Sequence, residues 1–135
     1  MSSLAILLSG QGNQYPQMTL DWIKYDPRLI KYVRETSSIF GFNMMDIIEA
    51  TDNRINDTFH AQPAIVLHSV LAYRILSCET KLTPKAFAGF SLGEYSAMNI
   101  ANVFNFHDTI SLVFQRAKAM QECAKIGRAS CRERV

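Results

Sequence analysis

Short apolar runs alternate along the chain with longer stretches of helical periodicity. Residues 4–8 form an apolar run that Ser9 and Gly10 end, and residues 86–88 form a second run. A short apolar run bounded by turn residues is typical of a buried strand. The order of strand, helices, strand and helices predicts an α/β fold with a parallel sheet. Two strands are too few for a parallel sheet covered on both faces, so we expect an incomplete domain.

The helical stretches carry start and stop signals. Asp26 and Pro27 predict the N-cap and first turn of a helix that Gly41 closes, and Gln62-Pro63 is expected to open the longest helix. The first two expected helices cover residues 27–40 and 43–50, and a polar loop follows at 51–58. The longest helix is expected from residue 62 to a connection at 81–85, and another helix covers 92–101. The last helix is expected after a capping pair of Asn105 and Asp108.

The composition is that of a folded protein and argues against several classes. Hydrophobic residues make up 48% of the 135 residues, yet no apolar run approaches the roughly 18 residues that a membrane span needs. No basic region precedes the run at residues 4–8, so we expect no signal peptide. Cys78, Cys123 and Cys131 have no metal-ligand spacing. They are interpreted as free thiols of a cytoplasmic protein.

The excess positive charge lies at the C-terminus. The formal net charge is +2, and segment 126–135 holds three arginines against Glu133. Without that segment the chain is neutral, so the remainder gives no reason to expect nucleic-acid binding. The segment also resembles the translation of a sequencing adapter. We therefore expect residues 1–125 to form a partial domain and residues 126–135 to be a non-native tail.

The motif that carries chemistry is Gly89-Phe90-Ser91-Leu92-Gly93. It lies between a predicted strand and a predicted helix, where a Gly-x-Ser-x-Gly turn exposes a nucleophilic serine. The backbone N–H that follows Ser91 would lie at a helix N-terminus, where it can stabilise an oxyanion. The alternative is a serine with a structural role in a buried turn.

A serine nucleophile needs a base, and the histidines do not offer an obvious one. His60 and His68 precede Ser91, and His107 follows it closely. A lipase-type triad has an acid and then a histidine after the serine, so an intact α/β-hydrolase is disfavoured. Arg116 lies at the edge of an apolar stripe and could pair with a carboxylate, although a solvated arginine is the simpler interpretation.

Four short motifs occur along the chain in an order that points to a known family. They are Gly10-Gln11-Gly12-Asn13-Gln14, Ala61-Gln62-Pro63-Ala64, Gly89 to Tyr95, and Gln115-Arg116-Ala117 followed by Met120. With this order and spacing, residues 4–124 resemble the malonyl-CoA:acyl-carrier-protein transacylase family. The resemblance implies the N-terminal part of an α/β-hydrolase-like acyltransferase domain with parallel strands and flanking helices.

The resemblance further implies a transfer of malonyl groups. Ser91 would be the catalytic nucleophile, and the backbone N–H groups of Gln11 and Leu92 would form the oxyanion hole. Arg116 would bind the malonyl carboxylate. The substrate would be the coenzyme A thioester malonyl-CoA, and the acceptor would be the phosphopantetheine thiol of an acyl carrier protein. No bound cofactor, metal, nucleic acid or membrane is implied.

The turn at Gly89 to Gly93 is called the elbow below. The family's general base is a histidine well beyond the elbow, and a small ferredoxin-like subdomain also lies beyond the residues present. We therefore expect negligible malonyl transfer by this chain alone. Phe90 departs from the histidine usual before the serine, which favours the malonyltransferase subunit of malonate decarboxylase with its prosthetic-group carrier subunit as acceptor. Leu92 and residues 94–97 favour the fatty-acid type. A serine hydrolase and a nonfunctional remnant are the rival classes.

Overall fold

Two parallel strands and their flanking helices confirm the α/β prediction in a computed structural model that describes residues 2–126. Strand β1 (Ala5–Leu8) pairs in parallel with β2 (Ala86–Gly89), in a register that sets Leu8 opposite Gly89. Of the expected tail at 126–135, only Ile126 lies within the described residues, so that prediction falls outside them.

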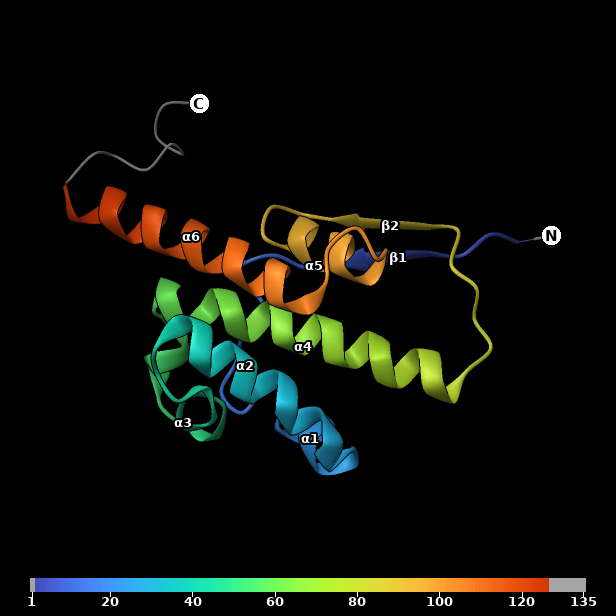
Figure 1. The fold of residues 1–135 in the computed structure, drawn as a ribbon, viewed down its shortest axis with the longest axis horizontal. Helices are drawn as coiled ribbons and strands as arrows, with labels where there is room; N and C mark the ends of the chain where they lie inside the picture. Colours follow the sequence, from blue (N-terminus) through green and yellow to red (C-terminus); the bar gives the residue numbers. More distant parts are fainter. Residues whose placement is uncertain (1, 127–135) are drawn as a thin grey trace.

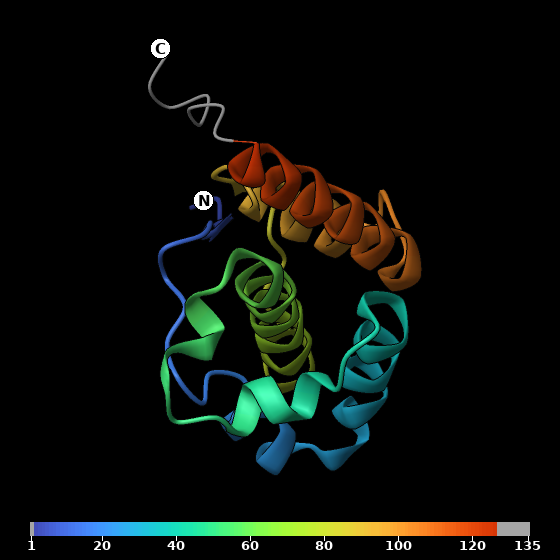
Figure 2. The same ribbon diagram turned by 90° about the vertical axis from the view of Figure 1, so that its left-hand side faces the viewer.

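Helices connect the strands and cover one side of the sheet. In chain order they are α1 (Leu20–Tyr25), the 3₁₀ helix η1 (Pro27–Leu29), α2 (Ile30–Phe40), α3 (Met44–Glu49), the 3₁₀ helix η2 (Asn53–Asn56), α4 (Thr58–Glu79), α5 (Gly93–Ile100) and α6 (Phe106–Lys125). In two perpendicular views α4 lies at the centre, with α6 on one side and α1 and α3 on the other, while α2 packs against both α4 and α6 (Figures 1 and 2). Helix α5 lies beside the strands.

The predicted caps are present. The side chain of Asp26 accepts a hydrogen bond of 3.1 Å from the Arg28 N–H at the start of η1, and Gly41 ends α2 with a φ of 79°. The side chain of Asn105 accepts a hydrogen bond of 2.8 Å from the Asp108 N–H at the start of α6. Each bond satisfies a backbone donor that the first turn of a helix leaves free.

Two local predictions are wrong, and one helix was not predicted. Helix α4 begins at Thr58, before the predicted Gln62-Pro63, because the Asp57 side chain accepts a 2.9 Å hydrogen bond from the Phe59 N–H. Pro63 therefore lies inside the helix, where burial of the surrounding residues 61–67 offsets the hydrogen bond that proline cannot donate. The predicted loop at 51–58 contains η2, and α1 was not predicted.

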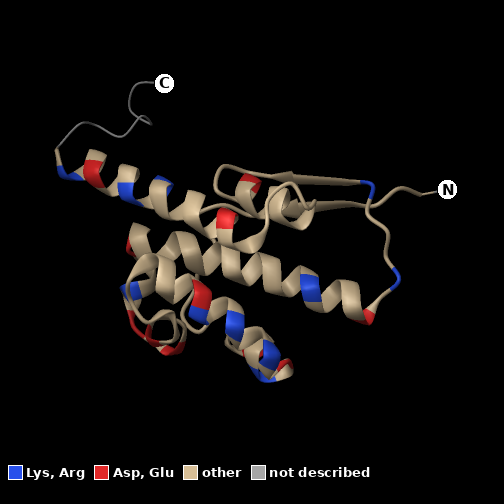
Figure 3. Cartoon of the chain, in the orientation of Figure 1, with Lys and Arg blue, Asp and Glu red and all other residues tan. Residues whose placement is uncertain are grey.

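The two faces of the sheet differ. Leu8 packs with Ala97 and Ile100 of α5, and Phe87 lies against this cluster. On the opposite face Leu7 is 79% exposed. Neither strand carries a charged residue, whereas the helices carry both signs (Figure 3). Within residues 2–126, no helix combines the length and the apolar character needed to cross a membrane.

Candidate active site

Ser91 occupies the sharp turn between β2 and α5, where the motif predicted it. Its φ of 54° lies in the left-handed region that L residues rarely adopt. The turn is closed by a hydrogen bond of 2.9 Å from the Gly93 N–H to the Phe90 carbonyl, and Ser91 is exposed. A backbone in this region costs about 1–3 kcal/mol, which the surrounding structure has to offset. Such a turn presents the serine hydroxyl to solvent and to substrate.

The two glycines of the motif are required by close packing. A Cβ atom on Gly89 would overlap the backbone of Gly93 at the start of α5. A Cβ atom on Gly93 would overlap the carbonyl group of Leu8 at the end of β1. Helix α5 can therefore approach both strands only with glycine at these positions, and this approach fixes the position of Ser91.

The N-terminal loop lies against the elbow. A Cβ atom on Gly10 would meet the Phe90 carbonyl, so the loop backbone at Gly10 and Gln11 passes close to the residue before Ser91. The Gln11 side chain donates a hydrogen bond of 3.2 Å to the Thr58 hydroxyl at the start of α4, which ties this loop to the helix. Among the described residues, the backbone N–H groups of Gln11 and Leu92 have no hydrogen-bond acceptor.

Arg116 of α6 reaches the serine. Its Nη2 donates a hydrogen bond of 3.1 Å to the Ser91 hydroxyl, and its Nη1 donates one of 2.9 Å to Oε1 of Gln62. The guanidinium carbon also lies 5.9 Å from the centre of the Tyr95 ring, near enough for a cation–π contact. Arg116 is half-buried. The structure therefore brings Ser91 and Arg116, which are far apart in the sequence, into direct contact.

Gln62 is a site residue that the sequence reasoning did not identify as such. It was quoted only as part of a motif, although a polar residue in the apolar run 61–67 of a long helix was a usable signal. Its side chain is fully buried, with 0% of its surface exposed. Besides accepting the bond from Arg116, it donates one of 3.3 Å to the sulfur of Met120.

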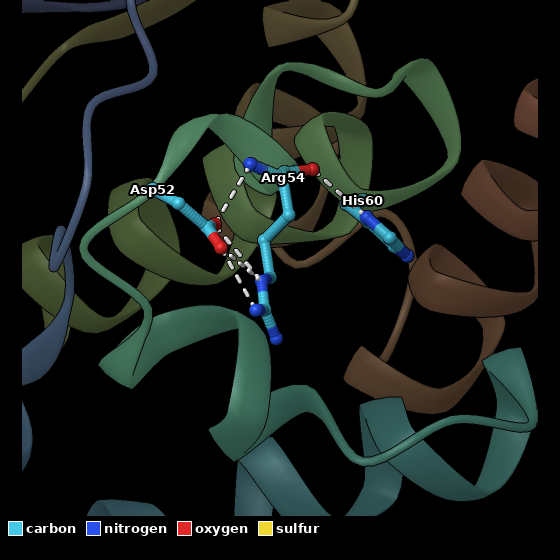
Figure 4. Close-up of polar contacts among 3 residues, drawn as sticks. All are labelled: Asp52, Arg54 and His60. Carbon is cyan, nitrogen blue, oxygen red and sulfur yellow. Dashed lines mark hydrogen bonds and ion pairs between the residues drawn. The ribbon is translucent and has the colours of Figure 1, made fainter.

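The described histidines form hydrogen bonds with groups other than Ser91, and His60 is the first example. Its Nδ1 lies 2.9 Å from the Arg54 carbonyl, which can only accept, so Nδ1 carries the proton (Figure 4). Arg54 in turn pairs with Asp52 at 2.8 Å, and this pairing lowers the pKa of the Asp52 carboxyl. His60 thus belongs to the structure around η2.

The other two histidines also have structural partners. The indole N–H of Trp22 donates a hydrogen bond of 3.0 Å to Nδ1 of His68, which joins α1 to α4. Burial lowers the pKa of His68 and so favours the neutral ring that can accept this bond. His107 lies 3.2 Å from Glu35 on the surface. No hydrogen bond joins a histidine to Ser91 within residues 2–126.

The described residues contain no group of three or more histidine, cysteine, aspartate or glutamate side chains placed to hold a metal ion. Cys78 and Cys123 are exposed free thiols. At Ser91 the structure places a hydroxyl beside the guanidinium of Arg116. A guanidinium can bind a carboxylate, so this pair could hold a carboxylated ligand next to a hydroxyl.

Known proteins are similar to this chain in sequence. A family model described as "Acyl transferase domain" matches residues 6–134. The malonyl CoA-acyl carrier protein transacylase of Haemophilus influenzae is 34% identical over 129 residues, which cover 94% of this chain and 41% of that protein. The chain thus spans about two fifths of the length of the curated relatives that it matches.

Solved structures agree with the sequence comparison. The crystal structure of the Streptococcus pneumoniae protein abbreviated MCAT has a TM-score of 0.79 and 35% identity, covering 88% of this chain and 39% of that one. A malonyl-transacylase solved in complex with a type II PKS acyl-carrier protein has a TM-score of 0.81 and 33% identity, covering 90% of this chain and 40% of that one. The predicted partial α/β acyltransferase fold is therefore confirmed.

Proposed function

This chain belongs to the acyl transferase domain family, and we propose that it carries the acyl-binding serine of a malonyl transfer from malonyl-CoA to an acyl carrier protein. The observation that carries the proposal is the 3.1 Å contact between Arg116 and Ser91. A guanidinium is a fork of donors that matches a carboxylate, and here it adjoins the hydroxyl that would attack the thioester. Malonyl differs from acetyl by that carboxylate.

The reaction would proceed by acyl transfer to the serine. The Ser91 oxygen attacks the thioester carbonyl and loses its proton, and the tetrahedral intermediate collapses with release of the coenzyme A thiol. The free N–H groups of Gln11 and Leu92 would bind the oxyanion. The malonyl-serine ester would then pass its acyl group to the phosphopantetheine thiol of the carrier. The carrier-bound relative supports this acceptor.

The proton of Ser91 has to reach a base during the attack. His60, His68 and His107 each form hydrogen bonds with other groups, which supports the prediction of negligible malonyl transfer by this chain alone. Acylation without a base remains measurable because one acyl group per chain is enough for detection. A single-turnover assay therefore suits this chain better than a steady-state assay.

Mass spectrometry of the intact chain after incubation with malonyl-CoA tests the proposal. We expect one malonyl adduct, mapped to the peptide that contains Ser91, and no adduct in the variant Ser91→Ala. Acetyl-CoA at the same concentration should label the chain far more slowly. A folded sample without a malonyl adduct at Ser91 would refute the proposal and favour a nonfunctional remnant. Equal labelling by both thioesters would favour a serine hydrolase.

A further inference from the structure

We infer that Gln62 is a positioning residue that holds Arg116 over Ser91 and thereby sets the preference for carboxylated acyl groups. This inference rests on the proposed function, because Arg116 is taken to bind the malonyl carboxylate. Among the described residues, no hydrogen bond joins the Gln62 side chain to Ser91. Gln62 acts through its hydrogen bond of 2.9 Å to Nη1 of Arg116.

The orientation of the Gln62 amide follows from its partners. Arginine has only donors, so the group that faces Nη1 must be the amide oxygen. The amide nitrogen then faces the sulfur of Met120 at 3.3 Å, and sulfur is a weak acceptor. Both bonds connect α4 to α6, and both end on the same face of α6, one turn apart.

The burial of position 62 explains why it holds glutamine. Gln62 is 0% exposed and is flanked by Ala61 and Pro63, which are buried as well. A buried amide without partners is unfavourable, so a structural role alone would be met at least as well by an apolar residue. The polar side chain at this position is explained by the guanidinium that it binds.

Packing fixes the backbone of Arg116 but leaves its side chain to be ordered. Val113 and Ala117, on either side of Arg116 along α6, are fully buried, which anchors the helix against its neighbours. The arginine side chain is long and loses much rotamer freedom when it binds a ligand. Gln62 holds one terminal nitrogen before substrate arrives, which lowers that loss by preorganisation. Nη2 then donates its hydrogen bond to the Ser91 hydroxyl, and a substrate carboxylate can replace that hydroxyl as the acceptor.

The test compares rates of Ser91 acylation by malonyl-CoA and acetyl-CoA in the whole chain and in Gln62→Met. Methionine keeps the length and burial and removes the amide oxygen. We expect the malonyl-to-acetyl rate ratio to fall about tenfold or more, the size expected for a hydrogen bond to a charged group. The malonyl-CoA concentration for half-maximal rate should rise, and it should rise more than the corresponding acetyl-CoA concentration. Leu67→Met, a buried methionine substitution on the same helix, is the control and should keep the ratio.

A second variant guards against a folding defect. Gln62→Glu places a carboxylate against the guanidinium and satisfies its charge internally, so malonyl acylation should fall further while acetyl acylation persists. Retention of the wild-type ratio in both folded variants would overturn the inference. If neither thioester acylates the wild-type chain, the proposed function fails instead.

A measurement independent of acylation separates these failures. In nitrogen-15 NMR spectra, we expect slow rotation of the Arg116 guanidinium in the wild-type chain and fast rotation in Gln62→Met. Equal rotation in both proteins would overturn the inference even if Ser91 is acylated. Slow rotation in the wild type alone would support the positioning role even if malonyl proves to be the wrong acyl group.

Discussion

Two regions differ in how well each residue suits its local conformation and hydrogen bonding. The first region is helices α2 and α3. The second, the elbow region, comprises β2, α5 and the facing parts of α4 and α6. In the first, Gly41 adopts the positive φ that ends α2, and the Ser37 hydroxyl donates to Val33 and accepts from Met44. In the second, Ser91 has a positive φ without being glycine. Ser96 is buried with no hydrogen-bond partner for its hydroxyl within residues 2–126.

We interpret this difference as a division between a region whose residues stabilise the fold and a region whose residues form the candidate site. Local rules that agree with the global structure stabilise a fold, and they are broken mainly at functional sites. In the elbow region, Ser91 has a positive φ although it is not glycine, and Gln62 is a polar residue that is fully buried. Ser91 and Gln62 both form hydrogen bonds with Arg116, to which we assign a part in acyl transfer, whereas α2 and α3 contribute no side chain to these bonds.

The largest expected effect separates the glycines of the two regions. Gly93→Ala should lower the free energy of unfolding by about 3 kcal/mol, because its Cβ would overlap the Leu8 carbonyl and nothing nearby can yield easily. Gly41→Ala meets no atom and should lower it by only about 1 kcal/mol, through its positive φ. Urea unfolding of both variants measures the difference. Equal losses would show that α5 does not need close contact with β1.

The next effect concerns arginines. Arg116→Ala should lower the malonyl-to-acetyl ratio of Ser91 acylation by about 30-fold or more, since a carboxylate would lose its charged partner in a partly desolvated site. Arg34 of α2 is exposed, and Arg34→Ala is the matched control that should leave the ratio unchanged. The single-turnover assay measures both. An unchanged ratio in Arg116→Ala would favour a serine hydrolase.

A smaller effect should have opposite signs in the two regions. Ser37→Ala removes a 2.9 Å bond to the Val33 carbonyl within α2 and a 2.8 Å bond from the Met44 N–H that connects α2 to α3, so the free energy of unfolding should fall by about 1 kcal/mol. Ser96→Ala removes a buried hydroxyl without a partner, so the free energy of unfolding should rise by a similar or smaller amount. Thermal unfolding of the two variants gives the signs, and a loss in Ser96→Ala would mean that its hydroxyl is satisfied in solution.

The smallest effect is a dependence of stability on pH. Burial lowers the pKa of His68 in the folded chain, so the unfolded chain binds the proton more readily. The His68 contribution is complete above the ordinary histidine pKa of about 6.5 and is lost as the pH falls through the lower, folded value. His68→Gln should flatten this part of the stability curve. Denaturant midpoints between neutral and mildly acidic pH test this, and the same slope in the wild-type chain and the variant would assign it to other groups.

Local signals predicted much of the fold. The apolar runs, the caps at Asp26 and Asn105 and the elbow motif each depend on neighbouring residues, and all were found as predicted. Helix α1 was missed because it has no buried residue, and no side chain caps its start. It is joined to α4 by the bond between Trp22 and His68, which joins residues far apart in the sequence.

The site was predictable only in part for the same reason. Ser91 could be placed from its motif, and the resemblance pointed to Gln11, Leu92 and Arg116. The hydrogen bond from Arg116 to Gln62 depends on how α4 packs against α6, which no local pattern specifies. The predicted start of α4 at Gln62-Pro63 also placed Gln62 at a helix end, whereas the Asp57 cap places it inside.

A competition experiment tests the central claim, that Ser91 accepts malonyl because Arg116 binds the malonyl carboxylate. The chain is mixed with equal concentrations of malonyl-CoA and acetyl-CoA, and the adduct at Ser91 is identified by mass spectrometry. We predict that the malonyl ester dominates in the wild-type chain and that this dominance is lost in Arg116→Ala. Equal amounts of both esters on wild-type Ser91, or an excess of acetyl, would contradict the account.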